Sequence, residues 1–249
     1  MAASENIADE DQRTLSVSVW RGTGETGRLE NYDVPSRENQ TILDVVTYIQ
    51  QEIDPTLTYR FSCRVGMCGS CAMMVNGEPR WTCRTHIMKV AKQGRIEIAP
   101  LRNLPVIKDL ATDMTEFFDK WVKAEGVFQG SATRDDAMAA IEPESPKRQA
   151  ANAGIECINC AVCYAACDAV SQNPDYLGPA ALNRAWTLVN DERDSARTER
   201  LRAVSEKGGC HTCHSHQSCM TYCPNELNPT ASIAGLKRAS LSAYLKGDL

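Results

Sequence analysis

The spacing of apolar positions changes about one hundred residues into the chain, and this change predicts two structural regions. In TLSVSVW (14–20), Leu15, Val17 and Val19 alternate with other residues at the two-residue period of a half-buried strand. The glycine-rich run GTGETG (22–27) is typical of a hairpin turn and predicts a second strand over residues 28–34.

A helix and a second hairpin follow in the first region. Thr41 is a typical helix-capping residue, and apolar residues follow it at helical spacing over 42–49. Further on, the apolar run AMMV (72–75) precedes Asn76-Gly77, a dipeptide that favours a tight hairpin turn. These elements suit a small mixed sheet that closes over one helix.

Three segments of the second region carry apolar residues at helical spacing, over 114–122, 180–190 and 230–246. Core packing is the default interpretation of these stripes, the first of which comprises Met114, Phe117, Phe118, Trp121 and Val122. Residues 129–153 are polar and interrupted by proline, which predicts a surface excursion. We place the join near Pro105, and the predicted parts are a flexible N-terminus (1–12), a sheet domain (13–108) and a helical domain (109–249).

Composition and charge exclude several classes of protein. The chain has 249 residues and a formal net charge of −5, which disfavours nucleic-acid binding. No apolar run approaches the length of a membrane span, and the acidic N-terminus does not resemble an export signal. We therefore expect an intracellular, reducing location, where the 12 cysteines are more often metal ligands than disulfide partners.

The first group of cysteines has the spacing of plant-type [2Fe–2S] ligands, with x₄ and then x₂ residues between the first three. Gly66 and Gly69 allow the loop to adopt positive φ and to direct backbone N–H groups at the sulfurs. The alternative is a structural zinc site, which usually pairs its cysteines as C-x₂-C on two turns. The predicted ligands of the [2Fe–2S] cluster are Cys63, Cys68, Cys71 and Cys83.

The second group is the run C-x₂-C-x₂-C-x₃-C of bacterial ferredoxins, whose fourth cysteine ligates the other cluster. A second motif downstream should therefore supply the fourth ligand of the cluster that the first three cysteines hold. The segment from Cys213 to Cys223-Pro224 meets that requirement. The predicted ligands of a [4Fe–4S] cluster are Cys157, Cys160, Cys163 and Cys223.

The remaining ferredoxin cysteines provide three thiolates, which predicts a [3Fe–4S] cluster held by Cys167, Cys213 and Cys219. His216 stands where the downstream motif would carry another cysteine, and it is an alternative fourth ligand. Cys210 is left over, close to His211, His214 and His216. We interpret Cys210 as a buried free thiol, with a further metal centre, completed by a partner chain, or a proton relay as the alternatives.

The three motifs together resemble the iron–sulfur subunit of succinate dehydrogenase and fumarate reductase (respiratory complex II). The resemblance covers roughly residues 14–245 and rests on segments that occur in the family's order. They are SCRVGMCGSCAMMVNG (62–77), IAPLRNLPVIKDL (98–110), CINCAVCYAAC (157–167), NPDYLGPAAL (173–182) and CMTYCPNELNPT (219–230).

The resemblance implies an α+β fold, with an N-terminal β-grasp plant-type ferredoxin domain followed by a mainly α-helical bacterial-ferredoxin-like domain. It further implies a subunit of an oxidoreductase of the tricarboxylic acid cycle and respiratory chain, which passes single electrons between FAD on a flavoprotein subunit and a quinone at a membrane anchor subunit. His214 matches a family position near the quinone, and we expect His214 and His216 to be quinone-proximal. The expected location is the cytoplasmic face of the cell membrane, with the chain held peripherally by the anchor.

Three alternatives to succinate oxidation are open. A fumarate reductase would pass electrons in the opposite direction, from the quinone to FAD. A relative with a thiol-linked acceptor would need a further cysteine-rich module, and the chain ends 26 residues after Cys223. A zinc-stapled interaction protein would use the same cysteines without redox function.

Overall fold

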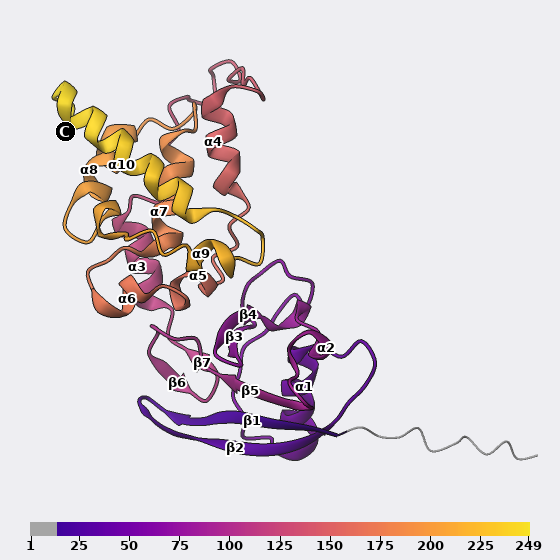
Figure 1. The fold of residues 1–249 in the computed structure, drawn as a ribbon. Helices are drawn as coiled ribbons and strands as arrows, with labels where there is room; N and C mark the ends of the chain where they lie inside the picture. The colour runs from indigo at the N-terminus through magenta and orange to yellow at the C-terminus, as the bar shows by residue number, and fades with distance from the viewer. Residues whose placement is uncertain (1–13) are drawn as a thin grey trace, which may run out of the picture.

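The computed structural model of the chain describes residues 14–249, and the predicted flexible segment 1–12 lies outside them. Five strands form one mixed sheet in the order β2-β1-β5-β3-β4 (Figure 1). β1 pairs antiparallel with β2 and parallel with β5. The strands are β1 (Thr14–Thr23), β2 (Thr26–Pro35), β3 (Ala72–Val75), β4 (Glu78–Trp81) and β5 (Arg95–Ala99).

Helix α1 (Ile42–Tyr48) covers one face of this sheet and continues as a π-helical turn, η1 (Ile49–Ile53). The predicted cap is confirmed: the Thr41 hydroxyl accepts from the backbone N–H of Asp44, and the Asp44 carboxylate accepts from that of Thr41. The predicted hairpin is confirmed as well, since Asn76 and Gly77 have φ of 51° and 80° between β3 and β4.

A two-stranded hairpin connects the sheet to the helices, formed by β6 (Val106–Lys108) and β7 (Ala111–Thr112). Asp109 lies in its turn and accepts hydrogen bonds from the backbone N–H groups of Gly22 and Thr58, at 3.0 and 2.9 Å. These bonds fasten the hairpin to the first domain. The predicted boundary between residues 108 and 109 falls within this hairpin and stays a prediction.

Helix α7 (Gly178–Val189) lies at the centre of the helical domain, packed against α3, α4, α5, α8 and α10 (Figure 1). The core is continuous between the two domains, because Ala72 and Met74 of β3 pack in one cluster with Val162 and Tyr164. The other helices are η2 (Thr82–Arg84), α2 (Ile87–Val90), α3 (Thr115–Lys123), α4 (Pro146–Ile155), α5 (Val162–Ala165), α6 (Asp168–Gln172), α8 (Arg197–Ser205), η3 (Cys210–Thr212), α9 (Ser218–Thr221) and α10 (Pro229–Lys246).

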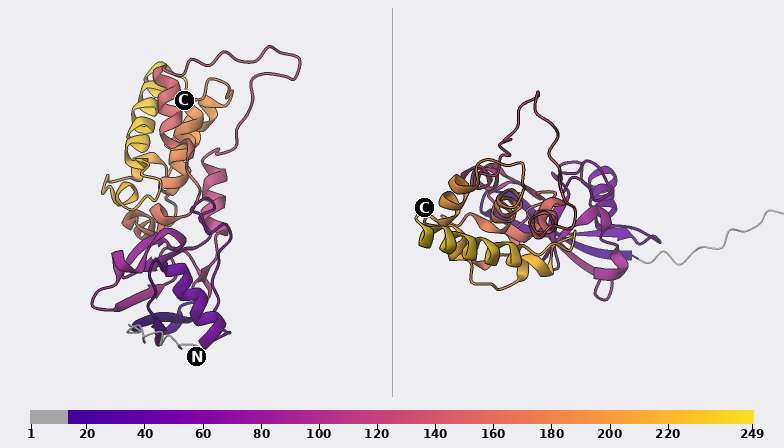
Figure 2. Two further views of the ribbon diagram at one scale, coloured as in Figure 1. Left: turned by 90° about the vertical axis from the view of Figure 1, so that its right-hand side faces the viewer. Right: turned by 90° about the horizontal axis from the view of Figure 1, so that it is seen from above.

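Two expectations from the sequence need correction. The predicted surface excursion is too long, because Ser145 caps α4 and Ala151 of that helix is fully buried; residues 129–145 do form an exposed loop (Figure 2). The stripe on α3 is only partly a core stripe. Phe117 is buried, whereas Phe118 and Val122, four residues apart on another face of the helix, are 45% and 58% exposed.

Candidate metal-cluster sites

The first thiol group consists of Cys63, Cys68, Cys71 and Cys83, which the loop before β3 and the turn η2 bring together. Backbone N–H groups are directed at three of its sulfurs. That of Met67 lies 3.2 Å from the Cys63 sulfur, that of Cys63 lies 3.5 Å from the Cys68 sulfur, and that of Cys83 lies 3.4 Å from the Cys71 sulfur. Such N–H groups stabilise negative charge on the sulfurs.

The glycines of this loop adopt the predicted conformation. Gly66 and Gly69 have φ of 76° and 71°, in the left-handed region that favours glycine. A Cβ atom at Gly66 would lie 2.8 Å from the Trp81 ring, so this residue is also constrained by packing within its own domain. The loop thereby curls around the thiols as a multi-iron cluster requires.

Two thiols of the first group lie in contrasting environments. The backbone N–H groups of Val65 and Met67 lower the pKa of Cys63 to about 6. Burial raises the pKa of Cys83 to about 11, an effect that the neighbouring Cys71 reinforces. Because burial opposes ionisation of Cys83, a cationic metal group is needed to keep this residue as a thiolate.

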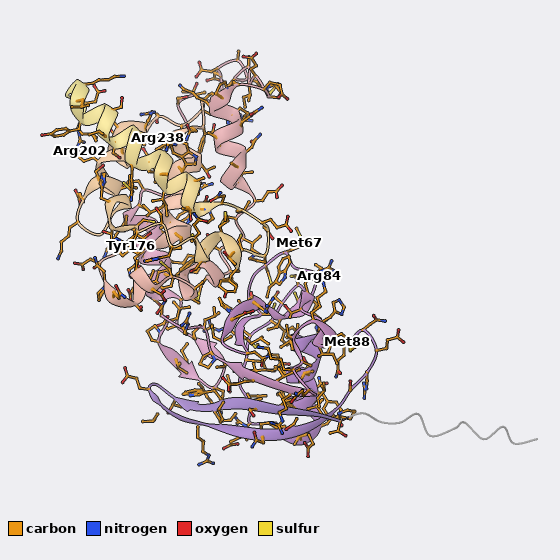
Figure 3. All side chains as sticks on the ribbon, in the orientation of Figure 1. Met67, Arg84, Met88, Tyr176, Arg202 and Arg238 are labelled. Atoms are coloured by element: carbon orange, nitrogen blue, oxygen red, sulfur yellow. The ribbon has the colours of Figure 1, made fainter. Side chains whose placement is uncertain are left out.

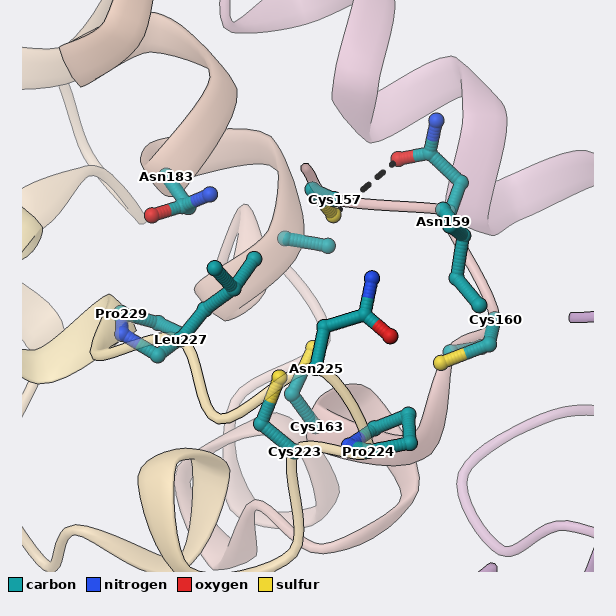
Figure 4. Close-up of a pocket in the computed structure, with 13 residues that line it drawn as sticks. Cys157, Asn159, Cys160, Cys163, Asn183, Cys223, Pro224, Asn225, Leu227 and Pro229 are labelled. Atoms are coloured by element: carbon teal, nitrogen blue, oxygen red, sulfur yellow. Dashed lines mark hydrogen bonds between the residues drawn. The ribbon is translucent and has the colours of Figure 1, made fainter. Parts of the chain in front are cut away.

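The second thiol group consists of Cys157, Cys160, Cys163 and Cys223, which line one pocket (Figure 4). Cys157 and Cys160 come from the turn that leads into α5, where Asn159 and Ala161 have positive φ. Cys163 lies in α5, and Cys223 comes from the segment after α9. The side-chain amide of Asn225 donates to the Glu156 carbonyl at 2.7 Å and joins the two segments.

Burial dominates the electrostatics of this second group. It raises the pKa of Cys160 to about 12 and that of Cys163 well above its ordinary value, and the neighbouring thiols raise both further. Four thiolates in such a pocket require positive charge between them. The donor set therefore fits a cationic iron–sulfur cluster.

The third thiol group consists of Cys167, Cys213 and Cys219. Burial raises the pKa values of Cys167 and Cys219, and the nearby Cys213 thiol adds to both shifts. The Cys219 sulfur lies 3.3 Å from the Thr230 hydroxyl, and the backbone N–H of Ser215 donates to the Cys213 sulfur at 3.4 Å. These contacts gather the three thiols that the sequence predicts for the [3Fe–4S] cluster.

Cys210 is fully buried in the apolar core, beside Ser240 and near both Lys237 and the Cys213 thiol. The rings of His214 and His216 are 6.1 Å apart, and both residues are exposed. Within residues 14–249, no three His, Cys, Asp or Glu side chains gather closely enough to hold a single metal ion.

Two further residues lie beside the thiols, and their roles were not predicted. Tyr176 is 1% exposed, and its pKa is raised by burial and by the neighbouring Cys213 and Cys167 thiols. Arg184 is half-buried, donates to the Gly126 carbonyl at 2.9 Å and lies near enough to Cys157 to interact with its charge. Neither belongs to a cysteine motif, so only the fold places them beside thiols.

The three groups follow one another through the molecule. Gly69, in the loop of the first group, packs directly against Cys160 of the second. Cys163 of the second group lies within electrostatic range of Cys219 of the third. The order along the structure is therefore first, second and third.

Two domain families match the chain. Residues 15–119 match a 2Fe-2S iron-sulfur cluster binding domain, and residues 156–228 match a 4Fe-4S dicluster domain. The matched segments contain the three thiol groups.

The relatives that match along nearly the whole chain are iron–sulfur subunits. The fumarate reductase iron-sulfur subunit of Haemophilus influenzae is 32% identical over 244 residues, covering 93% of this chain and 94% of the relative. The succinate dehydrogenase iron-sulfur subunit of Paracoccus denitrificans is 36% identical over 228 residues, covering 90% and 86%. A chain of the Mycobacterium smegmatis Sdh1 complex in the apo form has the same fold, with a TM-score of 0.81 at 25% identity and coverage of 93% and 97%.

Proposed function

The chain belongs to the family of iron–sulfur subunits of succinate dehydrogenase and fumarate reductase, and we propose that it carries electrons one at a time from FAD on a flavoprotein subunit to a quinone at a membrane anchor subunit. The predicted resemblance and fold class are confirmed. The observation that carries the proposal is the succession of three thiol groups, each adjacent to the next.

We assign the ligands according to these groups. The first thiol group holds the [2Fe–2S] cluster, the second holds the [4Fe–4S] cluster and the third holds the [3Fe–4S] cluster. When bound, the clusters supply one-electron redox centres between a two-electron flavin and a quinone. The chain's own contribution is to bury the thiols, direct N–H groups at the sulfurs and fix the distances between the sites.

The flavoprotein subunit is proposed to dock beside the first thiol group. Large apolar side chains are exposed there, including Val65, Met67 and Met88 at 59%, 70% and 80%. Figure 3 places Met67, Arg84 and Met88 along one edge of the sheet domain. An exposed apolar surface with neighbouring arginines is typical of a protein interface. Docking there would bring FAD close to the first electron acceptor.

The anchor and the quinone are proposed to lie at the opposite end of the succession, beside the third thiol group. The exposed His214 and His216 follow Cys213 directly, so they border this site from the solvent side. Over residues 14–249, each helix is too short or too polar to cross a bilayer. The location proposed for the chain, as a member of this family, is peripheral, on the cytoplasmic face of the membrane, with the anchor as the attachment.

The experiment that tests this function follows the colour of the purified complex. Succinate should bleach the brown oxidised protein, and a quinone should restore the colour. Bleaching by a quinol with recovery on fumarate, and none by succinate, would favour the fumarate reductase alternative. A colourless protein that contains zinc would overturn both.

A further inference from the structure

The loops of the first and second thiol groups touch each other at Gly69 and Cys160. A Cβ atom built on Gly69 would lie 2.6 Å from the Cys160 Cβ, 2.7 Å from its Cα and 3.1 Å from its backbone nitrogen. Real side chains do not approach so closely, so only a hydrogen fits between the two backbones. Gly69 itself is buried.

This contact involves or adjoins three predicted cluster ligands. Gly69 follows Cys68 and precedes Cys71 by two residues, and Cys160 belongs to the second group. Cys68, Gly69 and Cys160 line the same hollow between the two domains. The backbone contact at Gly69 therefore joins the loop of the first site directly to a ligand of the second.

The surrounding structure holds the contact in place. The side-chain amide of Asn103, in the segment that leaves the sheet, donates to the carbonyls of Tyr164 and Cys167 at 2.9 and 3.1 Å. Met74 of β3 shares a buried apolar cluster with residues of α5. The two domains thus meet as packed surfaces, and the distance between the two loops is fixed by them.

We propose that the Gly69–Cys160 contact is the crossing point for electrons between the first and second sites, with Gly69 as the positioning residue that keeps the two loops in contact. The proposal rests on the function proposed above. In the step, one electron leaves the group held by Cys63, Cys68, Cys71 and Cys83, which is oxidised, and reduces the group held by Cys157, Cys160, Cys163 and Cys223. No bond forms or breaks and no proton moves. Because electron tunnelling weakens steeply with each added gap, a side chain at position 69 slows this step.

The chain contains a control for backbone strain in Gly94, in the turn before β5. Its φ of 74° is close to the 71° of Gly69, so an alanine at either position strains the backbone in a similar way. At Gly94, however, a Cβ atom would have the Thr14 carbonyl oxygen as its nearest neighbour, at 3.9 Å. Gly94→Ala therefore imposes a similar backbone strain without separating the two sites.

The experiment compares the purified complexes carrying Gly69→Ala and Gly94→Ala with the wild-type complex. Two quantities are measured: the rate of electron transfer from the first to the second cluster after rapid reduction, and the relaxation enhancement of the reduced [2Fe–2S] EPR signal by its neighbour. Gly69→Ala should slow the transfer by about tenfold or more and weaken the relaxation enhancement, at wild-type iron content. Gly94→Ala should leave both at the wild-type values.

If Gly69→Ala loses iron, Gly69→Asn and Gly94→Asn replace the alanine variants, because asparagine tolerates positive φ while still adding a Cβ atom. Wild-type transfer and relaxation in an iron-complete Gly69 variant would overturn the proposal. Loss of iron in both Gly69 variants, with both Gly94 variants intact, would overturn it too, since Gly69 would then serve only the assembly of its loop. Absence of the clusters from the wild-type complex would instead refute the proposed function.

Discussion

The guanidinium of Arg200 forms a fully buried ion pair with the carboxylate of Asp194, with 2.6 Å between the Nη1 and Oδ1 atoms. The same side chain donates to the backbone carbonyls of Glu125 and Val127, at 2.7 and 3.0 Å. Arg200 thereby ties the segment after α3 to α8.

Replacing Arg200 by methionine should destabilise the chain by about 3–5 kcal/mol, because it leaves the Asp194 carboxylate buried without an opposite charge, with only the backbone N–H groups of Gln129 and Ala196 as donors. The matched control is Lys207→Met, which breaks an ion pair with Asp175 whose side chains are 87% and 56% exposed. That change should leave the unfolding midpoint near the wild-type value, because solvent screens the exposed pair. Denaturant unfolding of the two variants measures the difference, and equal midpoints would contradict the role given to Arg200.

The pH dependence of stability should reflect Asp191, which is buried beside Arg193 and Arg148. Hydrogen bonds from Arg193 lower the pKa of Asp191 to about 2 from an ordinary value of 3.8. The stabilisation by a carboxylate with a lowered pKa is complete above 3.8 and is lost as the pH falls through about 2. The free-energy gap between wild type and Asp191→Asn should therefore stay constant from about pH 8 to pH 5. A free-energy gap that narrows between about pH 8 and pH 5 would refute the low pKa assigned to Asp191.

Exposed methionines at the first thiol group should contribute to binding of the flavoprotein subunit. Met67→Glu and Met88→Glu place a charge on the proposed docking surface, so less flavoprotein should co-purify with the chain. Met138 provides the control, because it is 97% exposed in the loop over 129–145, away from that surface. Met138→Glu should retain the wild-type amount, and equal retention in all three variants would place the interface elsewhere.

Cys210 should prove dispensable for the clusters. Cys210→Ala is expected to retain about nine iron atoms per chain, the sum for the three cluster types, since the thiol packs in the apolar core. The lost sulfur should cost only about 1 kcal/mol of stability. Cys213→Ser, by contrast, should remove the third cluster. Iron analysis of both variants tests this prediction. Iron loss in Cys210→Ala would show that Cys210 is a cluster ligand.

Features set by local chemistry were predictable from the sequence. The Thr41 cap depends on Asp44 three residues later, and the β3–β4 turn depends on Asn76-Gly77. The membership of the thiol groups followed from cysteine spacing, because ferredoxin motifs exchange one ligand between clusters. Their assignment to individual clusters stays a prediction until iron is observed in each.

Features that depend on long-range packing were not predictable. Helix α8 buries Arg200 together with Leu201 and Val204, and the Arg200 guanidinium donates to carbonyls more than seventy residues away. The exposure of Phe118 and Val122 depends on which face of α3 packs against α7. The contact of Gly69 with Cys160 arises only when the two domains pack together.

The most direct test of the account is low-temperature EPR of the purified complex, first oxidised and then reduced. We predict a half-integer-spin three-iron signal in the oxidised sample and a [2Fe–2S] signal that appears on reduction. An EPR-silent oxidised sample, with two interacting [4Fe–4S] signals after reduction, would contradict the assignment of three thiolates to the third site.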